Sequence, residues 1–334
     1  MKIFKLVLFI FLIFLVHKID FSIDKDAEFY FKREDIYYEY DAAKQIQKGV
    51  NPYLRILEGD MLENDKYATQ LPHYYKFLTV VRDKSDDNFS GFIEGFRFVL
   101  FVAQSIGGTF LYLIFKKQDK PFLGLCASLF YVFNVWTLNS IIYLKQDVLA
   151  IGLLIMSFYF LTSKKLTPIS YIFYGLSLGI KYIGIFALPI FIVPYLSKKM
   201  PLKMLVINLV LLFSIILIPV IPYIVEDYNS FTRSILFSLT RSPSESEIIY
   251  GYNGLLSAPQ ESYSDTEILE KLVPRLPLFI SMLLTVGLLF IGKVKKGAYL
   301  FLSFFVFTIF NPVIFPQYIT WITPFALFPL LNDD

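Results

Sequence analysis

The sequence predicts an all-α protein that crosses a membrane many times. Hydrophobic residues make up 56% of the 334 residues, and the mean hydropathy is +0.57, whereas soluble domains are about 45–50% apolar. Several apolar runs approach the ~20 residues that a helix needs to span a bilayer. The runs are continuous and do not alternate with polar residues, a pattern typical of membrane helices and not of barrel strands.

Apolar blocks follow one another along the whole chain. They cover residues 3–16, 92–115, 122–142, 148–162, 169–196, 205–225, 276–292, 298–315 and 319–331. The first block follows a basic start, as a signal peptide would, but no small-residue cleavage site comes after it. We therefore expect residues 3–16 to form an uncleaved first transmembrane helix.

Lysine clusters between the blocks predict the topology. They are Lys2 with Lys5, Lys116–Lys117, Lys164–Lys165, Lys198–Lys199, and Lys293 with Lys295–Lys296. Basic residues favour the cytoplasmic side, but block 169–196 has a lysine pair at each end. We expect this block to be a hairpin of two short helices that turns outside at Gly179–Lys181. The result is about ten membrane segments, with both termini cytoplasmic, most simply in a prokaryotic plasma membrane.

Two long segments, 17–91 and 226–275, fall on the outer side of a single membrane domain that covers residues 1–334. Connections of this length are usually functional or disordered. Helical spacing around Tyr38–Ile46 predicts amphipathic helices that lie on the membrane within the first segment. The first outer segment is therefore where we expect catalysis.

Four acids interleaved with tyrosines stand out in that segment: Glu34, Asp35, Glu39 and Asp41. A carboxylate at a membrane surface can take a proton from an alcohol, as a general base does. The alternative is an ordinary solvated loop acid. Spacing alone does not decide between these two interpretations.

Two further positions combine charge with an apolar setting. Gln146–Asp147 opens block 148–162, where Asp147 would either cap the helix or line an outward cavity. Lys181 lies within a long apolar block, which is costly and points to function. It would either extend to the interface or hold an anionic lipid phosphate.

The outer segments hold other groups that could bind a substrate. His73 and Tyr74 would hydrogen-bond a sugar or phosphate, or would belong to an aromatic belt. Arg233, Arg241 and Arg275 could contact phosphate, since guanidinium groups bind phosphate through two hydrogen bonds.

Missing motifs narrow the chemistry. The sequence has no P-loop, dinucleotide-binding glycine pattern, zinc motif or Ser-His-Asp spacing. The net charge of +3 gives no nucleic-acid footprint, and one cysteine, Cys126, allows neither an internal disulfide nor a cysteine-based metal site. An enzyme whose site faces outward would need a donor that the membrane itself carries, an activated lipid.

Four motifs, taken in chain order, resemble those of one enzyme family. Asp35 leads a tyrosine-rich stretch that closes at Gly49-Val-Asn-Pro-Tyr53. Pro72-His-Tyr-Tyr75 ends the first outer segment, Gln146–Asp147 starts a helix, and Gly175-Leu-Ser-Leu-Gly-Ile-Lys181 precedes Leu188–Pro189. Together they resemble the GT-C membrane glycosyltransferases, above all the polyprenyl-phosphate-mannose-dependent mannosyltransferases of bacteria and archaea. Leu144 and Lys145 stand where that family has glycine before Gln146.

The resemblance implies a GT-C-like fold and an inverting transfer of a hexose, mannose by analogy. The donor would be a polyprenyl-phosphate sugar, and the acceptor a lipid, glycan or protein. Asp35 would be the general base, with Glu34 and Asp41 in reserve. Lys181, Arg233 or Arg241 would stabilise the departing phosphate. Substrate contacts are expected from Tyr38, His73, Tyr74, Gln146 and Asp147. No cofactor is expected, and nothing demands a divalent metal ion.

Two other classes of protein fit part of the pattern. A flippase or transporter of lipid-linked sugars would share the outer acids and the intramembrane lysine. A non-catalytic subunit of a glycosylation complex would keep Asp35 for structure alone. Long outer segments without an internal repeat favour the enzyme, because transporters more often show repeats.

Overall fold

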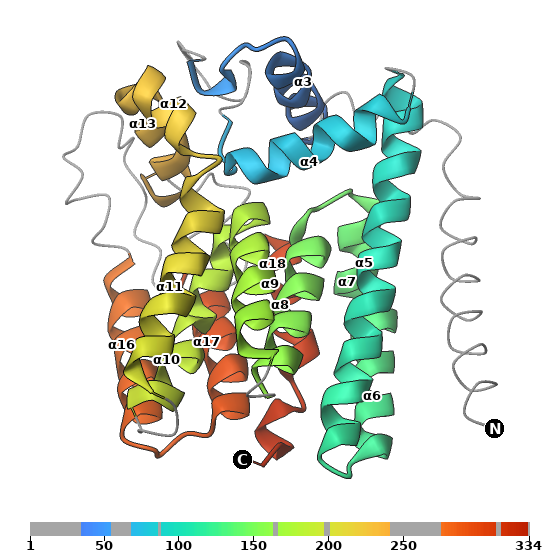
Figure 1. The fold of residues 1–334 in the computed structure, drawn as a ribbon. Coiled ribbons are helices and arrows are strands. Elements are labelled where there is room, and N and C mark those ends of the chain that lie inside the picture. The colour runs from blue at the N-terminus through green and yellow to red at the C-terminus, as the bar shows by residue number, and fades with distance from the viewer. Residues whose placement is uncertain are drawn as a thin grey trace, which may run out of the picture.

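The computed structural model describes residues 35–54, 68–85, 88–162, 166–196, 201–240, 275–311 and 315–332. Every described element is a helix, which confirms the all-α class (Figure 1). In order they are α3 (Asp35–Gln47), η1 (Pro52–Leu54), α4 (Pro72–Asp83), α5 (Phe89–Lys117), α6 (Pro121–Phe133), α7 (Val135–Ile142), α8 (Asp147–Leu161), α9 (Thr167–Ile180), η3 (Tyr182–Ala187), α10 (Leu188–Leu196), α11 (Leu202–Leu217), α12 (Ile221–Glu226), α13 (Tyr228–Thr240), α16 (Leu276–Phe290), α17 (Lys296–Phe310), α18 (Pro316–Ile319), η6 (Thr323–Phe325) and η7 (Phe328–Leu330). The first apolar block, 3–16, lies outside the described residues.

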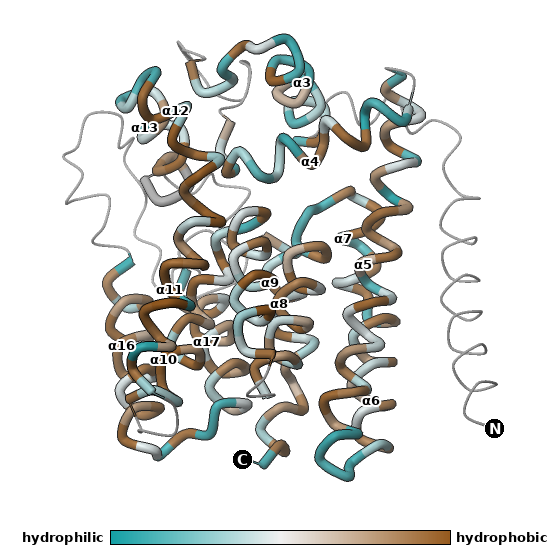
Figure 2. Tube along the Cα trace, viewed as in Figure 1, coloured by the Kyte–Doolittle hydropathy of each residue, from teal (hydrophilic) through white to brown (hydrophobic). Residues whose placement is uncertain are grey.

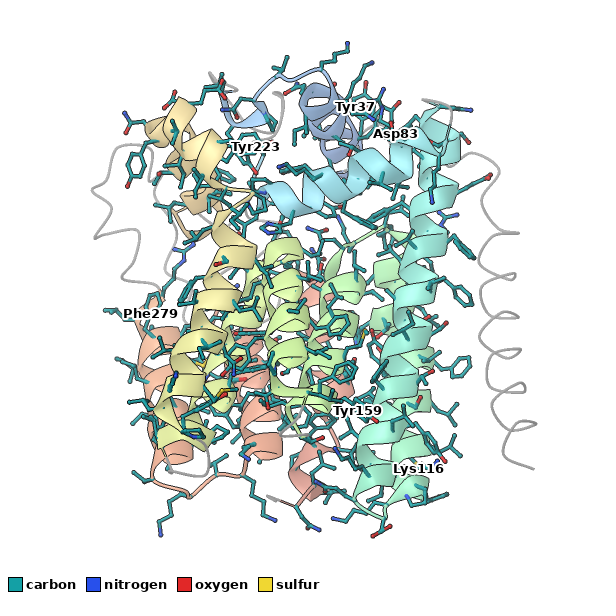
Figure 3. The ribbon with its side chains drawn as sticks, in the orientation of Figure 1. Tyr37, Asp83, Lys116, Tyr159, Tyr223 and Phe279 are labelled. Atoms are coloured by element: carbon teal, nitrogen blue, oxygen red, sulfur yellow. The ribbon has the colours of Figure 1, made fainter. Side chains whose placement is uncertain are left out.

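The molecule has a helical bundle and a cap. The long helices run side by side, and α3 and α4 lie across one end of them, here named the capped end (Figure 1). Lys116 lies at the opposite end (Figure 3), as do the connections from α5 to α6 and from α16 to α17. Lys116–Lys117 end α5, and Lys293 with Lys295 lie between α16 and α17, so this is named the lysine end.

Among the described helices, α5 alone is long and apolar enough to cross a membrane by itself. Helices α6 and α7 meet that length only as a pair, bent by 42°. Others, including α8, α11, α16 and α17, are apolar but shorter. The predicted number of about ten membrane segments is therefore not confirmed by the helix lengths.

Block 122–142, predicted as one helix, is broken at Asn134. This residue is extended, with φ −75° and ψ 149°, and its side-chain oxygen accepts the Thr137 N–H at the start of α7. Its amide nitrogen donates to the Phe130 carbonyl at the end of α6. Asparagine is a favoured N-cap, so one side chain ends α6 and begins α7.

Block 319–331, predicted as a final membrane helix, is instead a series of short turns. A proline stands in the first turn of each of α18, η6 and η7, where it lacks an N–H and cannot continue a preceding helix. The segment still packs within the bundle. The Thr320 hydroxyl donates to the Trp136 carbonyl in the first turn of α7. Asn332 donates its backbone N–H to Gln118 at the lysine end.

Block 169–196 folds back on itself at Lys181, as the predicted hairpin requires. The Tyr174 hydroxyl donates to the Gly184 carbonyl at 3.0 Å, and the Tyr171 hydroxyl donates to the Phe191 carbonyl at 2.7 Å. These pairs show that α9 runs antiparallel to η3 and α10. Lys181 is the extended residue at the turn, with φ −150° and ψ 117°.

Hydrophobic residues predominate along the helices of the bundle, α11 and α16 among them (Figure 2). On α11 and α16, side chains such as Val210, Phe213, Leu283 and Leu284 are about half exposed or more. Contiguous apolar patches of this kind mark a membrane or a protein contact. Inside, α5 and α8 approach closely, since a Cβ on Gly152 would lie 2.9 Å from the Ala103 carbonyl oxygen.

Candidate functional site

The cap is fastened to the bundle through His73 on α4. Its Nε2 lies 2.6 Å from the Ile215 carbonyl oxygen of α11, and its ring packs on α9 so closely that a Cβ on Gly179 would be 2.6 Å away. Burial lowers the pKa of His73, so the ring is neutral at pH 7. We predicted a substrate contact here, and the structure places the ring where it anchors the cap.

A second tie joins the two outer segments. Asn51 donates to Glu226 of α12 at 3.1 Å. The Tyr53 ring packs against Tyr223 and Phe231, with ring centres 5.2 and 4.8 Å away. The cap is thus held on the α4 side and on the α12–α13 side.

Asp35, the predicted base, begins α3 and pairs with Lys145. The Lys145 Nζ lies 3.0 Å from Asp35 Oδ2, and the side chains are 45% (Asp35) and 16% (Lys145) exposed. Lys145 follows Leu144, a buried residue with φ 54° in the left-handed region. A non-glycine residue rarely adopts this conformation. Such strain gathers at functional sites, and here it lies in the turn that carries Lys145.

Glu39 lies one helical turn after Asp35, on the same face of α3. The Tyr74 hydroxyl of α4 donates to its carboxylate at 2.6 Å. Burial raises the pKa of Glu39 to about 7, helped by the negative charge of Asp35 and opposed by the Tyr74 hydrogen bond and by Lys145 and Lys181. The pKa of the Tyr74 phenol is raised well above 10 by its own burial and by Glu39. Tyr74 therefore keeps its proton as a donor to Glu39.

Asp147 and Lys181 form a buried ion pair at the capped ends of α8 and α9. Lys181 Nζ lies 3.0 Å from Asp147 Oδ2, and the Asp147 side chain is 0% exposed. The Trp321 indole N–H donates to the other carboxylate oxygen at 2.6 Å. Gln146 is the N-cap residue of α8, and its side chain makes no capping hydrogen bond. The carboxylate of Asp147, the next residue, binds Lys181 and Trp321.

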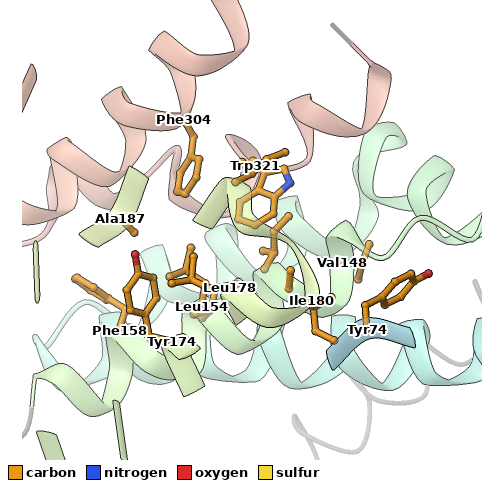
Figure 4. Packing of buried hydrophobic residues seen from close by; sticks show 14 of the residues in the cluster. Tyr74, Val148, Leu154, Phe158, Tyr174, Leu178, Ile180, Ala187, Phe304 and Trp321 are labelled. Carbon is orange, nitrogen blue, oxygen red and sulfur yellow. The ribbon is translucent and has the colours of Figure 1, made fainter. Parts of the chain in front are cut away.

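Two aromatic residues of the C-terminal turns, Tyr318 and Trp321, contact the Asp147–Lys181 pair. Lys181 Nζ lies 5.9 Å from the centre of the Tyr318 ring, within the range of a cation–π contact. Figure 4 shows Trp321 among buried residues of α8 and α9, including Val148 and Ile180, with Tyr74 of the cap at the same cluster. Four parts of the chain thus meet here: the cap, α8, α9 and the turns after α17.

The two ion pairs belong to one electrostatic unit. Lys145 and Lys181 both act on the Glu39 carboxyl, and Asp147 acts on the Tyr74 hydroxyl. We name the group Asp35, Glu39, Lys145, Asp147 and Lys181 the acid–lysine cluster. Its members are separated by up to about 150 residues along the chain and lie together at the capped end.

The other predicted residues are not members of the cluster, although Gln146 lies between two members in the chain. Asp41 accepts a hydrogen bond from Gln45 at 2.8 Å on another side of α3, and the Tyr38 ring packs edge-on against Tyr37. Gln146 is buried beside Asp147. Arg233 is exposed on α13, where its charge acts on Asp227. Glu34 and Arg241 lie outside the described residues.

The structure adds three groups that the sequence did not single out for a role in the site. Glu39 was one of four acids, and its i,i+4 spacing to Asp35 was the signal that could have selected it. Lys145 was noted only as a departure from the glycine of the resembled motif. Trp321 had no local signal, because its role depends on a contact with a residue 174 positions earlier.

Within the described ranges, no group of three or more His, Cys, Asp or Glu side chains is placed to hold a metal ion. No family model, curated protein or solved structure matches the chain. The acid–lysine cluster and the sequence motifs are therefore the features of this chain that bear on its function.

Proposed function

We propose that the protein is a membrane glycosyltransferase. It would move a hexose, mannose by the motif resemblance, from a polyprenyl-phosphate sugar to a hydroxyl of a lipid, glycan or protein acceptor, with inversion. One observation carries the proposal: an accessible carboxylate, Asp35, lies at the same end of the bundle as a buried lysine, Lys181, with Glu39 coupled to both. A base and a phosphate-binding cation are the two groups that this reaction needs.

Several features support a multi-pass membrane protein of about ten segments. The bundle exposes apolar side chains on α11 and α16, and after the turn at Lys181 the apolar η3 and α10 run back antiparallel to α9. Basic clusters favour the cytoplasm, so the lysine end would face inward and the capped end outward. A prokaryotic plasma membrane fits this arrangement.

Asp35 would act as the base in a single displacement. The acceptor oxygen attacks the anomeric carbon of the sugar, the bond from that carbon to the phosphate oxygen breaks, and Asp35 takes the hydroxyl proton. The lipid phosphate leaves with the electron pair of the broken bond. The Asp35 side chain is 45% exposed, so an acceptor can reach it, and Lys145 keeps its carboxylate in place.

Lys181 would hold the phosphate as charge builds on it. An ammonium group has three N–H donors, and one of them goes to Asp147. The others could meet phosphate oxygens in a partly dry environment, where such contacts stabilise a transition state most. Asp147 and Trp321 would fix the direction of the lysine. Arg233 and Arg241 remain further candidates for the same role.

Reconstitution tests the proposal. The purified protein in liposomes is given polyprenyl-phosphate-mannose and cell lipids, and mannose transfer is measured for wild type, Asp35→Asn and the control Asp83→Asn, an exposed acid at the end of α4. We expect transfer by wild type and by the control, and a loss of at least a hundredfold for Asp35→Asn. Equal transfer by all three would overturn Asp35 as the base.

The same liposomes separate the other classes of protein. Scrambling of the lipid-linked sugar by wild type and Asp35→Asn alike, without transfer, would identify a flippase. The absence of both transfer and scrambling would point to a non-catalytic subunit. For topology, single cysteines beside Lys181 are introduced after Cys126→Ala, and labelling only from the cytoplasm would refute the outward turn.

A further inference from the structure

We propose that Glu39, held by the Tyr74 hydroxyl, is a positioning residue that takes up a proton when an anionic phosphodiester binds beside Lys181. The inference deepens the proposed function and rests on it: donor binding would be coupled to protonation of a carboxyl that is not the base. The acceptor hydroxyl would still give its proton to Asp35.

The charges of the cluster lead to this role. Apart from Glu39, it holds two acids, Asp35 and Asp147, and two lysines, Lys145 and Lys181, and their charges balance. An ionised Glu39 makes the total −1, and a protonated Glu39 makes it zero. A phosphodiester carries one negative charge. The cluster with an ionised Glu39 repels it, because both are negative, whereas the cluster with a protonated Glu39 has no net charge to repel it.

The position of Glu39 makes it the acid that can change state. Asp35 and Asp147 each lie 3.0 Å from a lysine nitrogen, whereas Glu39 accepts a hydrogen bond from the neutral Tyr74 hydroxyl. The groups that act on Glu39 from the surrounding elements are Asp35 of its own helix, Tyr74 of α4, Lys145 before α8 and Lys181 after α9. Because its pKa is raised to about 7, Glu39 is about half protonated at pH 7.

Tyr74 serves both states of the carboxyl. Its hydroxyl donates to an ionised Glu39, and the same oxygen can stay in contact with the protonated acid. Since α4 is anchored by His73 to α9 and α11, Tyr74 holds Glu39 on the face of α3 that carries Asp35. The protonation of Glu39 then changes the charge of the site with the side chain still in place.

Calorimetric titration of the full-length protein in detergent tests the inference. The probe is farnesyl methyl phosphate, a phosphodiester whose single charge does not change between pH 6 and pH 8, and its uncharged methyl ether analogue corrects for partition into micelles. We expect the affinity of wild type to fall about tenfold from pH 6 to pH 8. At pH 8, titrations in two buffers of different ionisation enthalpy should show uptake of about 0.9 proton per bound probe, the ionised fraction for a pKa of about 7.

Variants separate this role from a structural one. Glu39→Gln should bind at pH 8 as tightly as wild type does at pH 6, without proton uptake. Tyr74→Phe removes a hydrogen bond that lowers the pKa of Glu39, so its fall in affinity should move to higher pH. Asp83→Asn, an exposed acid at the end of α4 and outside the cluster, should match wild type. The Tyr74→Phe shift and the wild-type proton uptake keep the test decisive even where Glu39→Gln fails to fold.

The outcomes distinguish the inference from the proposed function. Binding that is independent of pH, or that takes up no proton at pH 8, would overturn the role of Glu39 and leave the donor site standing. Absence of specific binding at every pH would overturn the phosphate site at Lys181, and the role of Glu39 with it.

Discussion

Replacing Lys181 by methionine should destabilise the fold strongly, because it strands a buried charge. The Asp147 side chain is 0% exposed and keeps only the Trp321 N–H when Lys181 is removed. Removal of one partner of a buried ion pair costs about 3–5 kcal/mol, and replacement of both partners by neutral groups of similar volume costs far less. The double variant Lys181→Met with Asp147→Asn should therefore recover most of the loss, with a coupling energy of about 2–3 kcal/mol.

Thermal unfolding in detergent, followed by tryptophan fluorescence, measures the effect. For 334 residues, an unfolding entropy of about 0.7 kcal/mol per kelvin converts 3–5 kcal/mol into a lowering of the midpoint by about 4–7 °C. We expect that lowering for Lys181→Met and a smaller one for the double variant. Under the proposed function, mannose transfer should be lost in both, since both lack the lysine proposed to bind the phosphate.

Two results would refute the buried, coupled pair of Asp147 and Lys181, and a third would refute the proposed role of Lys181 in transfer. Lys181→Met with an unchanged midpoint would show that Asp147 is not buried with its charge in the folded protein. A double variant whose loss equals the sum of the single losses would show that the two residues are not coupled. Recovery of stability together with recovery of transfer would remove Lys181 from the proposed mechanism.

Three further predictions concern the cap. The pKa of Glu39 is raised from 4.5 to about 7 on folding, so the contribution of Glu39 to stability is complete below pH 4.5 and is lost as the pH rises through about 7. Glu39→Gln should remove that loss, measured as the denaturant midpoint at pH 5 and pH 8. Lys145→Gln should change the free energy of unfolding by less than about 1 kcal/mol, because Asp35 is partly exposed. It should still lower transfer roughly tenfold by loss of orientation, and unaltered turnover would contradict this. Gly179→Ala should lower stability by about 1–3 kcal/mol through a clash with the His73 ring, and His73→Ala should relieve the clash in the double variant; a thermal midpoint equal to wild type would contradict the close packing.

Local signals in the sequence predicted part of the fold. The acidic start and helical spacing around Tyr38 indicated α3, and the lysine pairs at both ends of block 169–196 required a hairpin with Lys181 at its turn. Hydropathy misjudged other elements. Mean hydropathy over a segment carries no information about single residues that break a helix. Asn134 ends α6 and caps α7, and Pro324 begins a new turn inside an apolar run.

The candidate site was predictable in its parts and not in its pairings. Asp147 and Lys181 were marked by charge beside apolar sequence, and Asp35 by its place among acids and tyrosines in the resembled motif. Which acid meets which lysine depends on how α3 lies over α8 and α9, and hydropathy carries no information about that. The indole of Trp321 could not be assigned from sequence, because an apolar tryptophan near a helix end is common in any membrane protein.

The contact of Trp321 with Asp147 has a consequence for the order of assembly during synthesis. Asp147 and Lys181 leave the ribosome long before Trp321, which follows Asp147 by 174 residues. Until then the buried carboxylate has one of its two partners, and the turns from Thr320 to Phe328 have not filled the bundle between α5, α7 and α8. The carboxylate therefore gains its second partner only after Trp321 has been synthesised, when most of the described helices have already left the ribosome.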